Sequence, residues 1–222
     1  MHQKSSLNPR VWAIITMVCP ALLLSLLLIV TLSVPDYDPV KSLISALSLD
    51  NFWLGAALFI LSAITVLAFA RGLSGGIPLN EKAKTLNMLY LAAVCLLLLI
   101  FVDIDHVHGI WTFKRVVHWS IASAATGFFI VSCFLIAQSM KKDAAWQKMY
   151  VFTTVLAVLT MAAGIGMAFI IRPGLVGVLE RLILASAVIW VEAMSMRIYQ
   201  FSRRGGTIQW QRSASGQILP KL

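Results

Sequence analysis

Six long apolar stretches constrain the fold of this chain more than any other feature of its sequence. They span residues 11–33, 52–73, 86–103, 116–138, 150–171 and 176–199. An α-helix rises about 1.5 Å per residue, so about 20 apolar residues cross the hydrocarbon layer of a bilayer, which is about 30 Å thick. Lipid offers no hydrogen bonds to the backbone, and each crossing must therefore be helical. The sequence predicts an all-α membrane bundle of six transmembrane helices.

The composition excludes water as the solvent around most of the chain. Of the 222 residues, 59% are hydrophobic and 12% are charged, whereas a soluble domain has about 45–50% apolar and about 25% charged residues. The net charge of +9 does not indicate nucleic-acid binding, because the basic residues flank the apolar stretches and form no stripe on a polar domain. The expected partner is the lipid bilayer, and no nucleic-acid partner is expected.

Lysines and arginines between the stretches predict the orientation, because cytoplasmic loops of membrane proteins are enriched in them. If both termini lie on one side, that side carries thirteen: Lys4, Arg10, Arg71, Lys82, Lys84, Lys141, Lys142, Lys148, Arg197, Arg203, Arg204, Arg212 and Lys221. The other side carries four: Lys41, Lys114, Arg115 and Arg172. We therefore predict cytoplasmic termini and a multi-pass protein of the plasma membrane, the inner membrane of a bacterium.

Outside the spans, one short helix and one unstructured tail are expected. Asp38 can cap a helix whose first turn begins at Pro39. Apolar residues then recur at helical spacing as far as Leu47, which predicts a short helix lying in the outer interface. We divide the chain into a transmembrane domain, residues 1–199, and a basic, disordered cytoplasmic tail, residues 200–222.

Ionisable groups are costly inside a membrane, so their positions indicate function. Asp103 ends the third stretch and His118 begins the fourth. Glu180 and Arg181 lie just over one turn inside the sixth. The predicted topology places all four at the outer side of the membrane. Together with Ser45 of the first loop, they are predicted to line an outer-facing polar pocket.

The histidines of this region suggest a metal site as one alternative. Imidazole and carboxylate ligands suit Zn²⁺, which makes a bound water reactive near neutral pH. The candidate ligands are Asp105, His106, His108 and His118. Alternatively, a carboxylate orients His118 as a general base, or the histidines sense pH. A further alternative is that these are solvated loop residues, with Asp103 paired to Arg181 or to a loop lysine. No other cofactor is expected.

The last stretch carries four charged residues, and three of them, Glu180, Arg181 and Glu192, lie far enough inside it to require partners. Glu180 and Arg181 are adjacent and point about 100° apart around a helix, so each is expected to have its partner on another helix. Glu192 lies deeper, toward the cytoplasmic end. It is expected to pair with Arg197 or to face a polar cavity.

At these residues the chain resembles the DUF998 family, small membrane proteins named as a domain of unknown function. The matching elements, in chain order, are Asp36-Tyr37-Asp38, Ile44-Ser45-Ala46-Leu47, Asn51-Phe52-Trp53-Leu54-Gly55, Asp103, His118, Gly174-Leu175, Glu180-Arg181-Leu182 and Trp190. The resemblance covers nearly the whole chain. It implies a six-helix membrane bundle and no particular activity.

A second resemblance concerns chemistry. The set Ser45, Asp103 and His118 is similar to the Ser/Asp/His metal chemistry of alkaline-ceramidase-like and adiponectin-receptor-like membrane hydrolases, which makes these residues the catalytic candidates. Those proteins have seven spans and a His-x-x-x-His on the last helix, where this chain carries Glu180-Arg181. The departure weighs against a hydrolase.

Three functional hypotheses follow. The first is an inner-membrane protein of unassigned activity whose outer pocket, with Asp103, His118, Glu180 and Arg181 as ligand-binding residues, takes a lipid headgroup or another small polar ligand. The second is a metal-dependent lipid hydrolase. The third is a small transporter or an accessory subunit of a membrane complex. The sequence does not predict an oligomeric state.

Overall fold

The computed structural model describes residues 9–77, 79–102, 112–141, 143, 145–169, 175–203, 210–212 and 218–220. Its long helices are α1 (Pro9–Ser33), α3 (Phe52–Gly76), α4 (Lys82–Leu98), α5 (Phe113–Met140), α6 (Gln147–Phe169) and α7 (Val176–Arg203). Short elements are α2 (Leu47–Asp50), the 3₁₀ turn η1 (Leu99–Phe101), β1 (Trp210–Arg212) and β2 (Ile218–Pro220), the last two paired antiparallel.

Each of the six predicted stretches forms one of the six long helices, and the predicted fold class is confirmed. Five of them, α1 and α3 to α6, are long and apolar enough to cross a membrane. α7 has 28 residues but is not among these five. It carries Glu180, Arg181 and Glu192 within its length, so it differs from the others in charge and not in reach.

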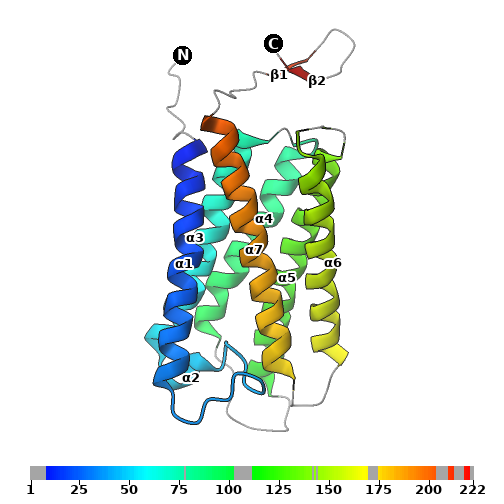
Figure 1. Cartoon of the computed structure of the whole chain (residues 1–222). Helices are drawn as coiled ribbons and strands as arrows, with labels where there is room; N and C mark the ends of the chain where they lie inside the picture. The colour runs from blue at the N-terminus through cyan, green and yellow to red at the C-terminus, as the bar shows by residue number, and fades with distance from the viewer. Residues whose placement is uncertain are drawn as a thin grey trace.

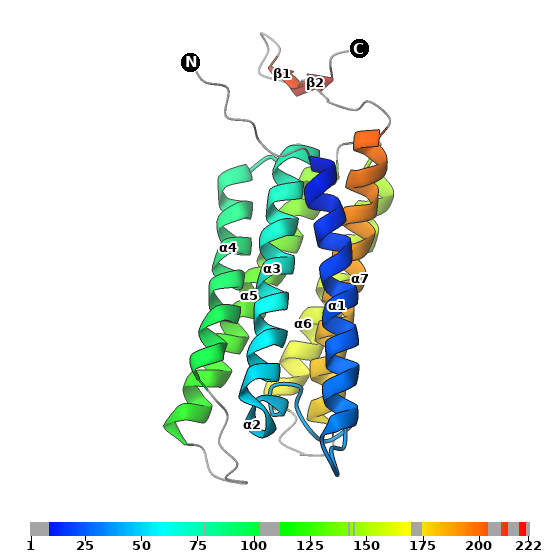
Figure 2. The ribbon, with the colours of Figure 1, turned by 90° about the vertical axis from the view of Figure 1, so that its left-hand side faces the viewer.

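The six long helices form a ring in chain order. Each packs against the next, and α7 closes the ring by packing against α1 (Figures 1 and 2). α3 also packs against α7 across the ring. Short connections between successive long helices make neighbours antiparallel, as in other helix bundles. α4 and α5 therefore lie on the side of the bundle away from α1 (Figure 2).

The first and last helices begin and end at the same end of the bundle, here called the terminal end (Figure 1). There the Arg10 guanidinium donates through Nε and Nη2 to the Ser202 carbonyl, with Nε 3.1 Å from the oxygen. The opposite end, here called the loop end, carries the first loop (residues 34–46) and α2. The cytoplasmic location of the terminal end stays a prediction.

The core of the ring is built around a buried tryptophan of α7. Trp190 is 1% exposed and packs edge-on against Phe69 of α3 and Phe129 of α5, with ring centroids 4.9 and 5.4 Å apart. Its indole N–H donates to Thr153 Oγ1 of α6 at 2.9 Å. One residue thus contacts three other helices, and its single polar atom is satisfied inside the bundle.

Replacing Thr153 by valine removes the acceptor of the Trp190 N–H and leaves a buried donor without a partner. This costs about 1–3 kcal/mol, so we expect Thr153→Val to lower the melting temperature of the detergent-purified protein, measured by tryptophan fluorescence. The matched control is Thr154→Val, because the Thr154 hydroxyl binds only the Tyr150 carbonyl of its own helix, at 2.8 Å. Equal destabilisation by both variants would contradict this role of Thr153.

Candidate functional site

The first loop lies against the first turns of α7 at the loop end. The closest approach is at Gly177, which is buried. A Cβ atom built on it would lie 2.5 Å from the carbonyl oxygen of Ser42 and 2.6 Å from that of Pro39. A residue with a side chain does not fit between α7 and the loop carbonyls without a shift of the backbone. The glycine therefore lets the loop backbone contact the helix directly.

Glu180, one turn further along α7, accepts backbone hydrogen bonds from the same loop. Its Oε2 accepts from the N–H of Ile44, and its Oε1 lies 3.4 Å from the backbone nitrogen of Ser45. Hydrogen bonds to a charged acceptor are stronger than those between neutral groups. The carboxylate thus accepts hydrogen bonds from two consecutive N–H groups that lie outside any helix or strand.

Arg181 binds the hydrogen-bond acceptors of the loop instead. Its Nη1 donates to the carbonyl oxygens of Ser42 and Gly177, both at 3.0 Å. Its Nη2 donates to the Tyr37 hydroxyl at 2.7 Å, and the guanidinium carbon lies 5.6 Å from the centre of that ring. The Tyr37 hydroxyl donates in turn to the Leu43 carbonyl at 2.9 Å. The arginine, the tyrosine and the loop backbone form one hydrogen-bonded group.

These contacts correct two sequence-based expectations. Within the described residues, the partners of Glu180 and Arg181 lie in the first loop and in α7 itself, and none lies on another helix. The helix expected from Pro39 to Leu47 is absent, because the chain makes turns there and α2 begins only at Leu47. The Glu180 carboxylate competes with the backbone for the N–H of Ile44. In a helix this N–H would instead bind the carbonyl oxygen four residues earlier.

His118 contributes to a different contact at the same end. It lies in the first turns of α5, is 3% exposed, and its Nδ1 is 2.6 Å from the Val102 carbonyl oxygen. Because a carbonyl can only accept, Nδ1 carries the proton. Thr112 caps this helix by accepting the N–H of Arg115 at 3.2 Å. His118 thereby ties the start of α5 to the end of η1.

The remaining candidates divide into two groups. Ser45 is buried beside Glu180, and within the described part of the chain neither Glu180 nor Arg181 bonds to His118. The other candidates lie outside the described residues: Asp103, Asp105, His106 and His108. Among the residues that the structure describes, no three His, Cys, Asp or Glu side chains gather to hold a metal. The predicted pocket and zinc site thus stay predictions.

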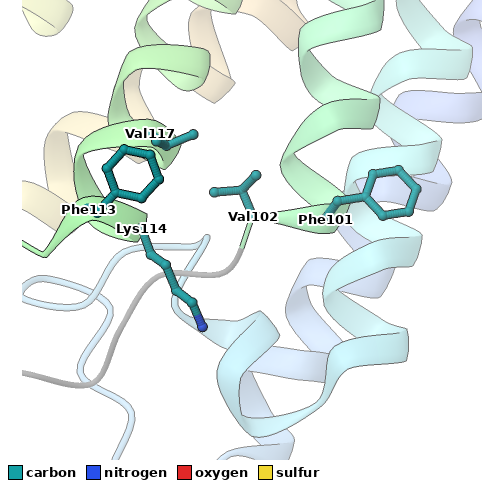
Figure 3. Close-up of a pocket in the computed structure, with 5 residues that line it drawn as sticks. All are labelled: Phe101, Val102, Phe113, Lys114 and Val117. Carbon is teal, nitrogen blue, oxygen red and sulfur yellow. The ribbon is translucent and has the colours of Figure 1, made fainter.

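A small open pocket that the sequence did not predict lies at the loop end between α4 and α5, with a volume of about 230 Å³. The described residues that line it are Phe101, Val102, Phe113, Lys114 and Val117 (Figure 3). Phe101 and Phe113 are 81% and 84% exposed. The sequence feature that indicates this pocket is Lys114, which directly follows Phe113 at the start of a long apolar helix.

Two titratable groups of the first loop have shifted acidities. Burial raises the pKa of Tyr37, although the Arg181 guanidinium acts in the opposite direction. The N–H of Val40, 2.9 Å from Oδ1, lowers the pKa of Asp38, and Lys41 at 3.2 Å lowers it further. Asp38 is solvent-exposed, so its ion pair contributes little to stability. Tyr37 is the residue whose titration reports on the packing of the loop.

A comparison with protein families gives one match. The family model described as "Protein of unknown function (DUF998)" matches residues 17–197. This range includes the first loop, α5 and the Glu180–Arg181 pair. No curated protein and no solved structure matches the chain.

Removing the Arg181 guanidinium should release the first loop. Hydrogen bonds to charged groups contribute about 1.5–3 kcal/mol each, so we expect Arg181→Leu to speed tryptic cleavage after Lys41 by roughly tenfold or more. Lys41 is exposed in the loop, and cleavage is measured by mass spectrometry of the detergent-purified protein.

Arg197→Leu is the matched control for this experiment. Arg197 also donates to a carbonyl, that of Ala145 at 2.9 Å, and lies 5.9 Å from an aromatic ring, Trp146, but at the terminal end. Its loss should leave cleavage after Lys41 unchanged. If both variants accelerate cleavage equally, the loop is not held by Arg181 in particular.

The titration of Tyr37 gives a second measure of loop packing. Its pKa in the folded protein lies above the ordinary value of 10.0, so folding favours the protonated phenol. The stability that this contributes is complete below pH 10 and is lost as the pH rises through the folded pKa. The difference in phenolate absorbance between wild type and Tyr37→Phe should have its midpoint above pH 10. A midpoint at 10 or below would show an exposed, unpacked tyrosine.

Proposed function

The chain belongs to the DUF998 family of membrane proteins of unknown function, and from this premise we propose that its pocket at the loop end binds the headgroup of an anionic phospholipid. We further propose that the protein resides in the bacterial inner membrane with the loop end facing outward. The distribution of lysine and arginine supports this orientation. The observation that carries the binding proposal is the pocket beside Lys114.

The chemistry of the pocket suits a molecule with one negative group and an apolar remainder. Phe113, Val117 and Val102 lie around the gap between the two helices, whereas the Lys114 side chain runs from the start of α5 toward the loop end and Phe101 points away from the other four (Figure 3). Lys114 forms no ion pair within the described part of the chain. An ammonium group beside apolar side chains matches the region where a phosphate joins the acyl chains.

The position of the pocket also favours lipid over a water-soluble ligand. Several large aromatic residues near the loop-end termini of the helices are strongly exposed: Trp53 at 79%, Phe101 at 81%, Phe113 at 84% and Phe169 at 79%. Tryptophan is enriched at the boundary between acyl chains and headgroups, and the three phenylalanines expose apolar rings suited to contact with acyl chains. We therefore expect a pocket at this level to face lipid headgroups.

Glu180 and Arg181 do not enter the proposed pocket as ligands. All their hydrogen bonds within the described residues go to the first loop or to α7 itself. Their role in the proposal is to fix the loop end, so that α5 and Lys114 present a constant surface. The hydrolase and transporter hypotheses gain no observation from the described residues.

Replacing Lys114 by glutamine tests the proposal. One lysine near an anionic surface contributes about 1 kcal/mol, so we expect Lys114→Gln to reduce the preference for phosphatidylglycerol over phosphatidylcholine about fivefold. The measurement is native mass spectrometry of lipids retained by the purified protein. Soluble glycerol phosphate should not displace the bound lipid, since it lacks the apolar part.

Lys41→Gln is the control, because Lys41 lies at the same end but pairs with Asp38 at 3.2 Å. It should retain the wild-type lipid preference. An unchanged preference in Lys114→Gln, or an equal loss in both variants, would overturn the proposed site.

A further inference from the structure

Glu192 is a carboxyl group of α7, which runs the length of the bundle beside the five helices that are long and apolar enough to cross a membrane (Figure 1). At a rise of about 1.5 Å per residue, it lies about 17 Å from Arg181 at the loop end and about 8 Å from Arg197 toward the terminal end. Both arginines bind loop carbonyls and so indicate where the helix leaves the hydrocarbon. Glu192 lies between them, at a depth where a charged group is costly.

Glu192 has no partner within the described part of the chain. It makes no hydrogen bond or ion pair there, and its side chain is partly exposed. The pairing with Arg197 expected from the sequence is not formed, because Arg197 donates to the Ala145 carbonyl instead, at 2.9 Å. Among the described residues, nothing supplies the hydrogen bonds that a carboxyl group at this depth requires, and a partner from outside the chain can supply them.

The direction of the Glu192 side chain keeps its carboxyl group from reaching the membrane surface. In an α-helix the Cα–Cβ bonds tilt toward the N-terminus, which for α7 is the loop end. The side chain of Glu192 therefore leans toward the middle of the membrane and away from the nearer, terminal end. A long lysine or arginine reaches headgroups by extending outward, but this shorter, oppositely inclined group does not.

The surface around Glu192 has the spacing of a helix-pairing surface. Residues at alternating intervals of three and four form one stripe, here called the α7 seam: Leu182, Ala185, Ile189, Glu192 and Met196. The three large apolar members are 50–53% exposed, and α7 lies in front of the bundle between α1 and α6 (Figure 1). Intervals of three and four are those of the a and d positions of a coiled coil.

We propose that the α7 seam pairs with the same seam of a second copy of this chain, with the two Glu192 carboxyl groups hydrogen-bonded to each other. Within hydrocarbon a carboxyl group is present in its neutral form, which has one donor and one acceptor. A two-fold axis along the membrane normal places identical residues opposite each other. Two such groups then satisfy one another, which no single lipid chain does. Polar side chains stabilise helix pairs in this way.

Cysteine cross-linking in native membranes tests the geometry. The natural cysteines, Cys19, Cys95 and Cys133, are first replaced by alanine, and a single cysteine is placed at Met196 or, as control, at Val155. Val155 is 51% exposed on α6, against 52% for Met196 on the seam. Oxidation should give a disulfide-linked dimer at position 196 and not at position 155. Equal cross-linking at both, or none at 196, overturns the proposal.

Dimerisation in lipid tests the role of the carboxyl group. In a dilution series of fluorescently labelled protein in liposomes, Glu192→Leu should weaken the dimer about fivefold, as expected for one buried polar contact. Glu192→Gln keeps a donor and an acceptor and should retain most of the association. Because Glu192 has no partner among the described residues, neither variant should lower the melting temperature of the monomer.

The remaining outcomes are equally decisive. A chain that stays monomeric at every lipid dilution contradicts the proposal. If the cysteine at 196 cross-links to a different membrane protein while the purified chain stays monomeric, the seam serves another partner and self-association is wrong. A dimer that Glu192→Leu does not weaken would show that apolar packing alone holds it, which also contradicts the carboxyl pairing.

Discussion

The loop end depends on two adjacent residues of α7 that bind the same loop through opposite chemistry. Glu180 accepts backbone N–H groups, whereas Arg181 donates to backbone carbonyls and to Tyr37. A loop at the edge of a membrane has backbone groups that no helix pairs, and lipid cannot hydrogen-bond them. The neighbouring charges supply both kinds of partner from one rigid helix. The loop then needs no regular structure of its own, and Gly177 lets it lie directly on α7.

At the terminal end, arginines likewise donate hydrogen bonds to backbone carbonyls. Arg197 donates to the Ala145 carbonyl beside Trp146, and Arg10 donates to the Ser202 carbonyl. A guanidinium is suited to this role because it remains charged and offers several donors in a fixed plane. Arginines at helix ends thus connect segments that apolar packing alone would leave loosely ordered. Glu192 differs from these groups, because it has no partner in the part of the chain that the structure describes.

The sequence predicted the helices well because each span follows from a local property. A run of apolar residues long enough to cross the bilayer is visible without knowing its neighbours, and the second span begins at Phe52 as expected. The first loop was harder. The periodicity after Asp38 favours a helix, but the contact that prevents it comes from Glu180, 136 residues away from Ile44. A local pattern cannot show a long-range acceptor.

The same limit explains the candidate site. Glu180 and Arg181 were recognised as unusual because charge in a membrane helix is rare, yet rarity does not distinguish a ligand from a structural partner. Once their hydrogen bonds are known, the loop end has fewer groups left to bind a ligand, and Lys114 gains importance. Lys114 lies at the start of α5, which is on the side of the ring away from α1, whereas α7, which carries the seam, lies beside α1 (Figures 1 and 2). Pairing through α7 would therefore leave both pockets of a dimer open to the surrounding lipid, and neither proposal restricts the other.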